Sequence, residues 1–229
     1  MPKTIAGIAE DVLLKWVTAS LREGQNALGR GYQCHTLLYR NARRPLVVKA
    51  PLGRGFAAFV RRRMLRREYK VYKRLAGSPG IPNCHGFLAE RFLVLEFIDG
   101  VPIGEARITD RDFFFDALLR QIETLHRGGV AHGDLKKKDN ILVVDGRRPV
   151  LLDFGVAVIR KPGLAPVNRY LFGLFRKFDL NAYVKLKYRK RVDRISAADR
   201  PFYHRTLVER SAGGIKRSYL KAKKWLLGN

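Results

Sequence analysis

The stretch Val130–Gly155, which reads VAHGDLKKKDNILVVDGRRPVLLDFG, decides the fold of this chain. It contains two short apolar runs, Ile141–Val144 and Val150–Leu152. The runs are separated by the turn-forming pair Asp145-Gly146 and two arginines. Short apolar runs on either side of an Asp-Gly turn predict a β-hairpin.

The hairpin would bring three oxygen-bearing side chains to one end. Asp134 and Asn140 precede the first strand, and Asp153 follows the second. Such a set suits a hard cation such as Mg²⁺, which keeps water and substrate phosphates among its ligands. A plain buried hairpin with solvated turn carboxylates is the simpler alternative.

Two tripeptides in this stretch carry a resemblance to a known family. His132-Gly133-Asp134 stands before an Asn, and Asp153-Phe154-Gly155 closes the hairpin. In this order the segments resemble the catalytic and metal-binding segments of the protein-kinase-like superfamily. A lone Asp-Phe-Gly arises by chance, but both halves in order with a hairpin between them favour the kinase-like interpretation.

The resemblance implies a role for each of these residues. Asp134 would position or deprotonate the acceptor hydroxyl, and Lys136 would contact the transferred phosphate. Asn140 and Asp153 would bind Mg²⁺. The family has four residues between its catalytic Asp and the Asn, whereas here there are five. Counting forward from Asp134 makes Asp139 the equivalent, and counting back from the hairpin, which we favour, makes it Asn140.

A strand over 45–50 and a helix over 56–75 are predicted to hold a buried ion pair. Glu68 fills the central gap of an apolar helical stripe that consists of Val60, Met64, Val71 and Leu75. A carboxylate in such a stripe needs a cationic partner, and Lys49 on the preceding strand is the candidate. Surface pairs with basic residues of the same helix are the alternative. In the family, the lysine holds the ATP phosphates and the glutamate orients it.

Two further segments of the ATP site are implied by the resemblance alone. Gly29 and Gly31 lie where a glycine-rich phosphate loop would be, although Cys34 replaces the third glycine of the family pattern. The backbone at Glu96 to Ile98 would bind adenine at a hinge. A plain hairpin turn and a buried strand are the alternatives.

The remaining elements complete an α+β, bilobal protein-kinase-like fold. The predicted elements are a helix over 6–22, strands over 36–40, 84–88 and 92–97, and a helix capped by Thr109. Residues 1–97 would form a small β-rich N-lobe with one main helix, and residues 98–229 a truncated, mostly helical C-lobe. No long activation segment follows Gly155, so the chain looks most like compact atypical kinases: the RIO family, lipopolysaccharide-core sugar kinases and aminoglycoside phosphotransferases.

The C-terminal third is strongly basic. Residues 157–229 hold 19 Lys and Arg against 4 Asp and Glu, with aromatic residues between them. We predict two short basic helices, 169–178 and 182–191. Their aromatic residues suit contact with anionic lipid or with RNA. Equally, those residues could face the core of the C-lobe while the charges are solvated.

The composition limits the compartment and the partners. A net charge of +26 on 229 residues favours anionic partners such as nucleic acid, acidic lipid head groups or phosphorylated sugars. Two cysteines indicate a reducing compartment. Glu10 and Asp11 interrupt the N-terminal apolar positions, so a secretory signal is not expected, and no apolar run is long enough to span a bilayer. We expect a cytoplasmic protein, with peripheral contact at the inner membrane face as an option.

These features predict an ATP- and Mg²⁺-dependent kinase that transfers the γ-phosphoryl group to a hydroxyl. The acceptor would be a protein Ser/Thr, as in RIO-like proteins, or a lipopolysaccharide-core sugar. The alternative is a catalytically weak pseudokinase that acts as a nucleotide-, RNA- or membrane-binding module.

Overall fold

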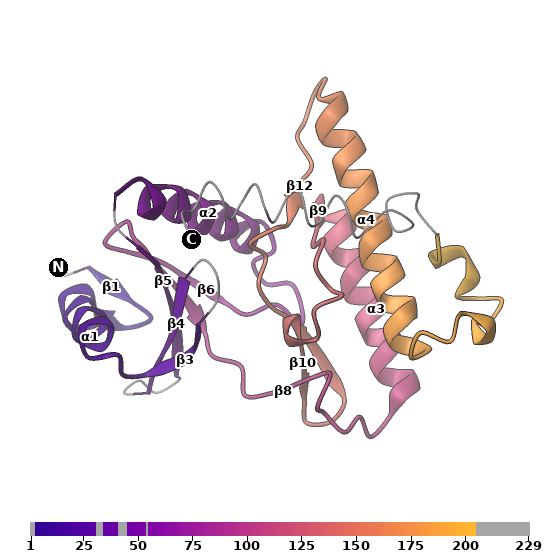
Figure 1. Ribbon diagram of the computed structural model, residues 1–229, viewed down its shortest axis with the longest axis horizontal. Helices are drawn as coiled ribbons and strands as arrows, with labels where there is room; N and C mark the ends of the chain where they lie inside the picture. The colour runs from indigo at the N-terminus through magenta and orange to yellow at the C-terminus, as the bar shows by residue number, and fades with distance from the viewer. Residues whose placement is uncertain (1–2, 31–33, 41–44, 54, 205–229) are drawn as a thin grey trace. The chain divides into compact units, whose positions relative to one another are not determined.

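A computed structural model describes residues 3–30, 34–40, 45–53 and 55–204 of the chain (Figure 1). It divides into two compact units: unit 1 is Met1–Gly77 with Pro82–Asp99, and unit 2 is Ser78–Ile81 with Gly100–Asn229. Unit 1 is built around a β-sheet, whereas unit 2 contains two long helices. The predicted α+β class is confirmed.

Unit 1 contains one five-stranded antiparallel sheet with the strand order β3-β4-β5-β7-β6. Its elements in chain order are β1 (Thr4–Ile5), β2 (Ile8–Ala9), α1 (Glu10–Glu23), β3 (Ala27–Arg30), β4 (Cys34–Tyr39), β5 (Leu46–Pro51), α2 (Gly55–Arg74), β6 (Cys84–Leu88) and β7 (Phe92–Glu96).

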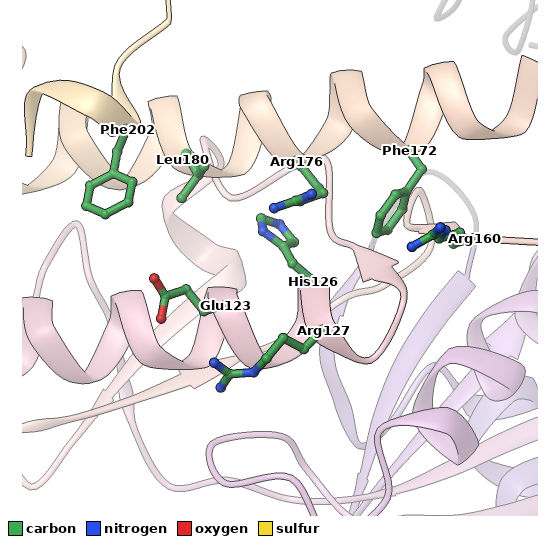
Figure 2. A pocket seen from close by; sticks show the side chains of 8 residues that line it. All are labelled: Glu123, His126, Arg127, Arg160, Phe172, Arg176, Leu180 and Phe202. Atoms are coloured by element: carbon green, nitrogen blue, oxygen red, sulfur yellow. The ribbon is translucent and has the colours of Figure 1, made fainter.

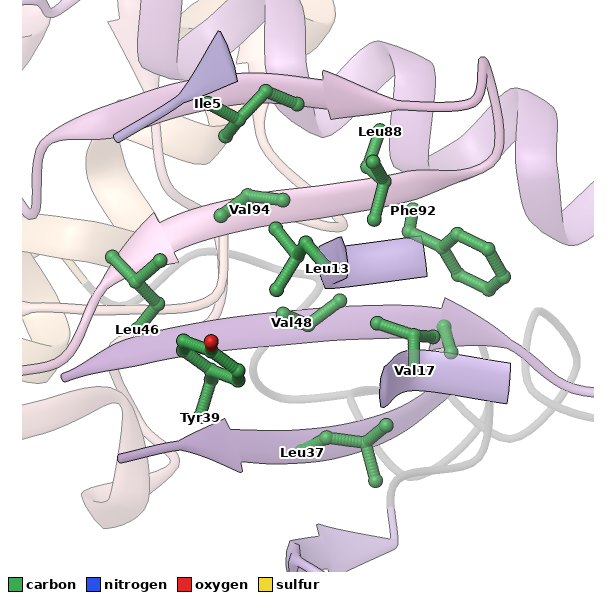
Figure 3. Packing of buried hydrophobic residues seen from close by; sticks show 11 residues of the cluster. Ile5, Leu13, Val17, Leu37, Tyr39, Leu46, Val48, Leu88, Phe92 and Val94 are labelled. Atoms are coloured by element: carbon green, nitrogen blue, oxygen red, sulfur yellow. The ribbon is translucent and has the colours of Figure 1, made fainter. Parts of the chain in front are cut away.

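The side chains of β5 alternate between the two faces of this sheet, as strand geometry requires. Leu46 and Val48 join a buried cluster with Leu13 and Val17 of α1 (Figure 3). Lys49, between Val48 and Ala50 in sequence, turns to the other face and contacts α2. The two helices therefore cover opposite faces of the sheet.

Helix α1 begins four residues later than predicted. Ala6 and Gly7 have φ values of 53° and 79°, in the left-handed region, and form the turn of the β1–β2 hairpin. Ala is uncommon in that region, so the sequence carries no Asn-Gly or Asp-Gly signal for this turn.

Unit 2 combines two long helices with short strands. Its elements are β8 (Val101–Pro102), α3 (Arg111–Arg127), β9 (Val130–Ala131), the 3₁₀ turn η1 (Lys138–Asn140), β10 (Ile141–Val144), β11 (Arg148–Leu151), β12 (Val158–Ile159), α4 (Pro166–Lys187), η2 (Val192–Arg194) and η3 (Arg200–Phe202). The strands form a β11-β10-β8 sheet and a separate β12-β9 pair.

Two expectations for unit 2 are corrected. The N-cap of α3 is Asp110, whose side chain accepts a hydrogen bond from the Phe113 N–H; the Thr109 hydroxyl instead donates to the Gly146 carbonyl. The two short helices expected after residue 168 are one continuous helix, α4, of 22 residues. None of the helices within the described residues is both long and apolar enough to cross a membrane.

Candidate active site

In unit 1, Lys49 and Glu68 form a buried ion pair. The Lys49 Nζ lies 2.6 Å from Glu68 Oε1, and the two side chains are 11% and 4% exposed. Glu68 is on the buried face of α2 together with Leu65, Val71 and Tyr72. The prediction from the apolar stripe is therefore correct in its geometry. Burial makes each charge depend on the other, because either one alone would be desolvated without compensation.

The structure says less about the other residues of unit 1 that were expected at the ATP site. Gly29 lies in β3, at a register shift opposite β4, and Gly31 falls outside the described residues. The backbone N–H of Glu96 donates to the Asn83 carbonyl, and the Glu96 carboxylate accepts from the Asn83 backbone and side chain. The N–H of Glu96 is thus occupied within the protein, and its role at a hinge remains an expectation, as does that of Ile98.

In unit 2, the predicted hairpin is present as β10 and β11. Ile141 pairs with Leu151 and Val144 with Arg148. Beyond the last pair, the Leu152 N–H donates to the Asn140 carbonyl at 2.9 Å. Asn140 and the residue after Leu152, which is Asp153, therefore leave the hairpin at the same end.

Asp134 joins this end of the hairpin through Asn140. The Asn140 side-chain amide donates to the Asp134 carbonyl at 3.0 Å, and Asn140 is 1% exposed. Asp139 and Lys136 are exposed. The extra residue is taken up in η1, which turns Asp139 outward and Asn140 inward. The inward position agrees with counting back from the hairpin.

His132 connects the catalytic-loop segment to the Asp-Phe-Gly segment. Its Nε2 donates to the Leu152 carbonyl at 2.9 Å, and its Nδ1 accepts from the Asp134 N–H at 3.3 Å. The His132 ring also lies 4.8 Å from the Phe154 ring, centroid to centroid. Asp153 has a φ of 62°, a conformation that costs a non-glycine residue energy and that often marks a functional position.

Asp179 of α4 is a further residue of this site that the sequence analysis did not identify. It is fully buried, and its carboxylate accepts hydrogen bonds from the backbone N–H groups of His132 and Gly133 at 2.8 and 2.7 Å. The Nε2 of His126 lies 3.0 Å from the same carboxylate. A buried carboxylate with three such partners fixes the backbone directly before Asp134.

Gly133 explains why the motif reads His-Gly-Asp. Its φ is +78°, and a Cβ at this position would overlap the ring of Phe175 on α4. A larger residue would both strain the backbone and displace the helix that carries Asp179.

The side-chain donors of unit 2 fit a hard cation. The amide nitrogen of Asn140 donates to the Asp134 carbonyl, so its amide oxygen and the Asp153 carboxylate are the oxygen donors of the residues that leave the hairpin at this end. Within the described residues, no cluster of three or more His, Cys, Asp or Glu has the spacing of a metal site. Two protein oxygens match a Mg²⁺ ion that takes its remaining ligands from phosphates and water.

Comparison with known proteins agrees with these motifs. The serine/threonine-protein kinase cds1 of Schizosaccharomyces pombe is 31% identical over 106 residues, which cover 42% of this chain and 23% of that kinase. Casein kinase II subunit alpha' of Saccharomyces cerevisiae is 23% identical over 191 residues, which cover 76% of this chain and 54% of that protein. The chain is similar to protein kinases.

The kinase-like similarity is partial. Calcium-dependent protein kinase 25 of Arabidopsis thaliana is 29% identical over 112 residues, which cover 43% of this chain and 21% of that kinase. The matches thus span between about a fifth and about half of these relatives. No protein-family model matches the chain. The subtype within the kinase-like proteins therefore has to be argued from the site.

Proposed function

We propose that this protein is an ATP- and Mg²⁺-dependent phosphotransferase that transfers the γ-phosphoryl group of ATP to a hydroxyl. The observation that carries the proposal is the buried Lys49–Glu68 pair, because a desolvated ammonium held by a carboxylate has no evident structural advantage over an apolar contact. It has a clear use if Lys49 binds ATP phosphates and Glu68 orients it.

Unit 2 supplies the residues for the acceptor and the metal. Asp134 would accept the proton of the acceptor hydroxyl as its oxygen bonds to the γ-phosphorus. The bond from that phosphorus to the β–γ bridging oxygen breaks, and ADP leaves. Asn140 and Asp153 would hold Mg²⁺, which when bound offsets the charge of the phosphates. Lys136 would stabilise the charge that develops on the transferred group.

The charge around Asp134 favours an anionic acceptor. Lys136, Lys137 and Lys138 follow it directly and are all exposed. We therefore place a phosphorylated lipopolysaccharide-core sugar ahead of a protein Ser/Thr as acceptor, and a cytoplasmic location follows from the use of ATP.

Transfer of labelled phosphate from ATP tests the proposal. Purified lipid A-core and a basic model protein are offered as acceptors, and lipid A-core is expected to be labelled. Asp134→Asn should abolish transfer while thermal stabilisation by ATP and Mg²⁺ is retained, because Asp134 acts on the acceptor. Labelling of the protein alone would assign the RIO-like acceptor. Nucleotide binding without transfer to either acceptor, and without ATP hydrolysis, would identify a pseudokinase.

A further inference from the structure

The loop before α4 and the first turns of the helix carry exposed apolar side chains. Leu164 is 97% exposed, Val167 72%, Tyr170 68% and Leu171 39%. The three helical residues are spaced by three and four, so they share one face of the helix. Soluble proteins expose such residues singly, whereas a contiguous group of them marks an interaction surface. We call these four residues the α4 stripe.

The stripe is separate from the core of unit 2. Phe172, which follows Leu171, is 6% exposed and packs in a cluster with Ala131 and Val158. The opposite side of the same turns thus serves the core. In Figure 1 the first turns of α4 extend past the end of α3, so the stripe lies on a projecting end of the helix.

The charged residues of the segment that carries the stripe all have one sign. Residues 154–178 contain no Asp or Glu and hold five basic residues: Arg160, Lys161, Arg169, Arg176 and Lys177. All five are exposed, and none forms an ion pair with another described residue. Basic residues in a segment that also exposes apolar side chains complement a bilayer surface, where anionic head groups cover apolar acyl chains.

A separate pocket lies between α3 and α4. It has a volume of about 420 Å³, and Phe172, Arg176 and Leu180 line it from α4 (Figure 2). Phe172 is on the side of α4 opposite the stripe, and the Glu123 carboxylate shares the lining with the arginines. The docking surface is therefore the stripe and does not include this pocket.

We propose that the α4 stripe, with the basic residues of the same segment, docks the protein on a bilayer that contains anionic phospholipid. The stripe enters the interfacial region, and the basic side chains are attracted by the anionic head groups. RNA fits less well, because base stacking needs aromatic side chains and Tyr170 is the only one among the four stripe residues. The proposal does not depend on phosphotransfer.

Flotation with lipid vesicles, in the absence of ATP, tests the docking surface. The full chain should bind phosphatidylcholine vesicles only when they include phosphatidylglycerol. Replacing Leu164, Val167 and Tyr170 together by Ser should weaken binding at least about tenfold, because three interfacial side chains are lost. The matched control replaces Phe56 and Phe59 of α2, which are 69% and 56% exposed, by Ser and should bind as the wild type does.

A second pair of variants separates the basic residues near the stripe from net charge. Arg160→Gln with Lys161→Gln, two exposed positions shortly before Leu164, should weaken vesicle binding by about tenfold or more, because basic residues near an anionic membrane strengthen binding. Arg63→Gln with Arg120→Gln removes the same charge from exposed positions on α2 and α3 and should have a smaller effect. Asp153→Ala should bind vesicles normally, which keeps this result distinct from the kinase proposal.

Three outcomes would overturn the docking surface. The first is equal loss of vesicle binding in the Arg160/Lys161 variant and its charge-matched control. The second is a stripe variant that binds as tightly as the wild type. The third is displacement of the wild-type protein from vesicles by inorganic phosphate or by single-stranded RNA, which would assign the surface to a free phosphate or to RNA.

Discussion

At the scale of single residues, the Lys49–Glu68 pair makes the most direct prediction. Lys49→Met leaves Glu68, 3% exposed, without its cationic partner in the interior of unit 1. We expect the free energy of unfolding to fall by about 3 kcal/mol, because a buried charge is stranded. Urea denaturation followed by circular dichroism measures this change.

The double variant Lys49→Met with Glu68→Leu is the matched control for this prediction. Removing both charges should recover most of the lost stability, since the penalty comes from the unmatched carboxylate. Phosphotransfer should be lost in both variants. A single variant as stable as the wild type would show that the pair carries no energetic coupling.

Gly133 gives a second prediction at this scale. Gly133→Ala should inactivate the protein and destabilise unit 2, because the added Cβ meets the Phe175 ring and the backbone φ is +78°. Gly163→Ala isolates the backbone contribution, since Gly163 has a φ of +69° and open space around it. The control should lose only about 1 kcal/mol of stability and keep its activity. Equal loss of stability and activity in the two variants would contradict the role of Phe175.

Glu68 and Asp179 are both carboxylates that interrupt an apolar helical stripe. This pattern predicted the burial of Glu68. Asp179 interrupts the stripe in α4, where it is the first acidic residue after Asp153 and is in helical register with the buried Phe172, Ala182 and Tyr183. The partners of Asp179 cannot be recognised in the sequence. They are backbone N–H groups of the catalytic loop, and every residue type except proline has such a group.

At the scale of elements, the C-terminal end of α4 is fixed by Lys187 and Asp199. The Lys187 Nζ lies 2.8 Å from the Asp199 carboxylate, which also accepts from the Tyr188 hydroxyl at 2.6 Å. Burial alone would raise the pKa of Asp199, but the hydrogen bonds from Lys187 and Tyr188 outweigh it and lower that pKa. Burial likewise opposes the charged form of Lys187, yet its bonds to Asp199 and Tyr183 raise its pKa.

These directions predict how stability depends on pH. The contribution of Asp199 is complete above the pKa of its unfolded form, about 4, and is lost as the pH falls through the lower folded value. The contribution of Lys187 is complete below its unfolded pKa and is lost only in strong alkali. Asp199→Asn should lower the free energy of unfolding by about 1.5–3 kcal/mol at neutral pH. It should also make the loss of stability below about pH 4 less steep. Denaturant titrations at a series of pH values measure both effects, and a variant that loses stability in acid as steeply as the wild type would contradict the role of Asp199.

Elements with local signals were predicted well, and those that depend on tertiary contacts were not. Asp145 and Gly146 have φ values of 51° and 68°, as the Asp-Gly turn of the β10–β11 hairpin requires. The continuity of α4 could not be read in this way, because Asp179 divides its apolar face and its partners lie in another part of the chain. The β1–β2 hairpin has an Ala-Gly turn that local propensity does not indicate.

At the scale of the whole molecule, the order of motifs along the chain identified the kinase-like character, since each segment alone was weak evidence. The residues proposed to act on one nucleotide are divided between the two units. Lys49 and Glu68 belong to unit 1, and Asp134, Asn140 and Asp153 to unit 2. The proposed function therefore requires Lys49 and Asp153 to act on the same ATP with its Mg²⁺, and this requirement can be tested through binding energies.

A double-mutant cycle on nucleotide stabilisation measures this requirement. ATP with Mg²⁺ should raise the melting temperature of the wild type, and Lys49→Met or Asp153→Ala alone should remove most of that increase, each measured against its own ligand-free variant. Because both side chains would act on the same ligand, the double variant should lose little more than either single one. Asp139→Asn, at the exposed position beside Asn140, is the control and should keep the full increase. Losses that simply add would mean that Lys49 and Asp153 act at independent sites. A full increase in either single variant would remove that residue from the nucleotide site.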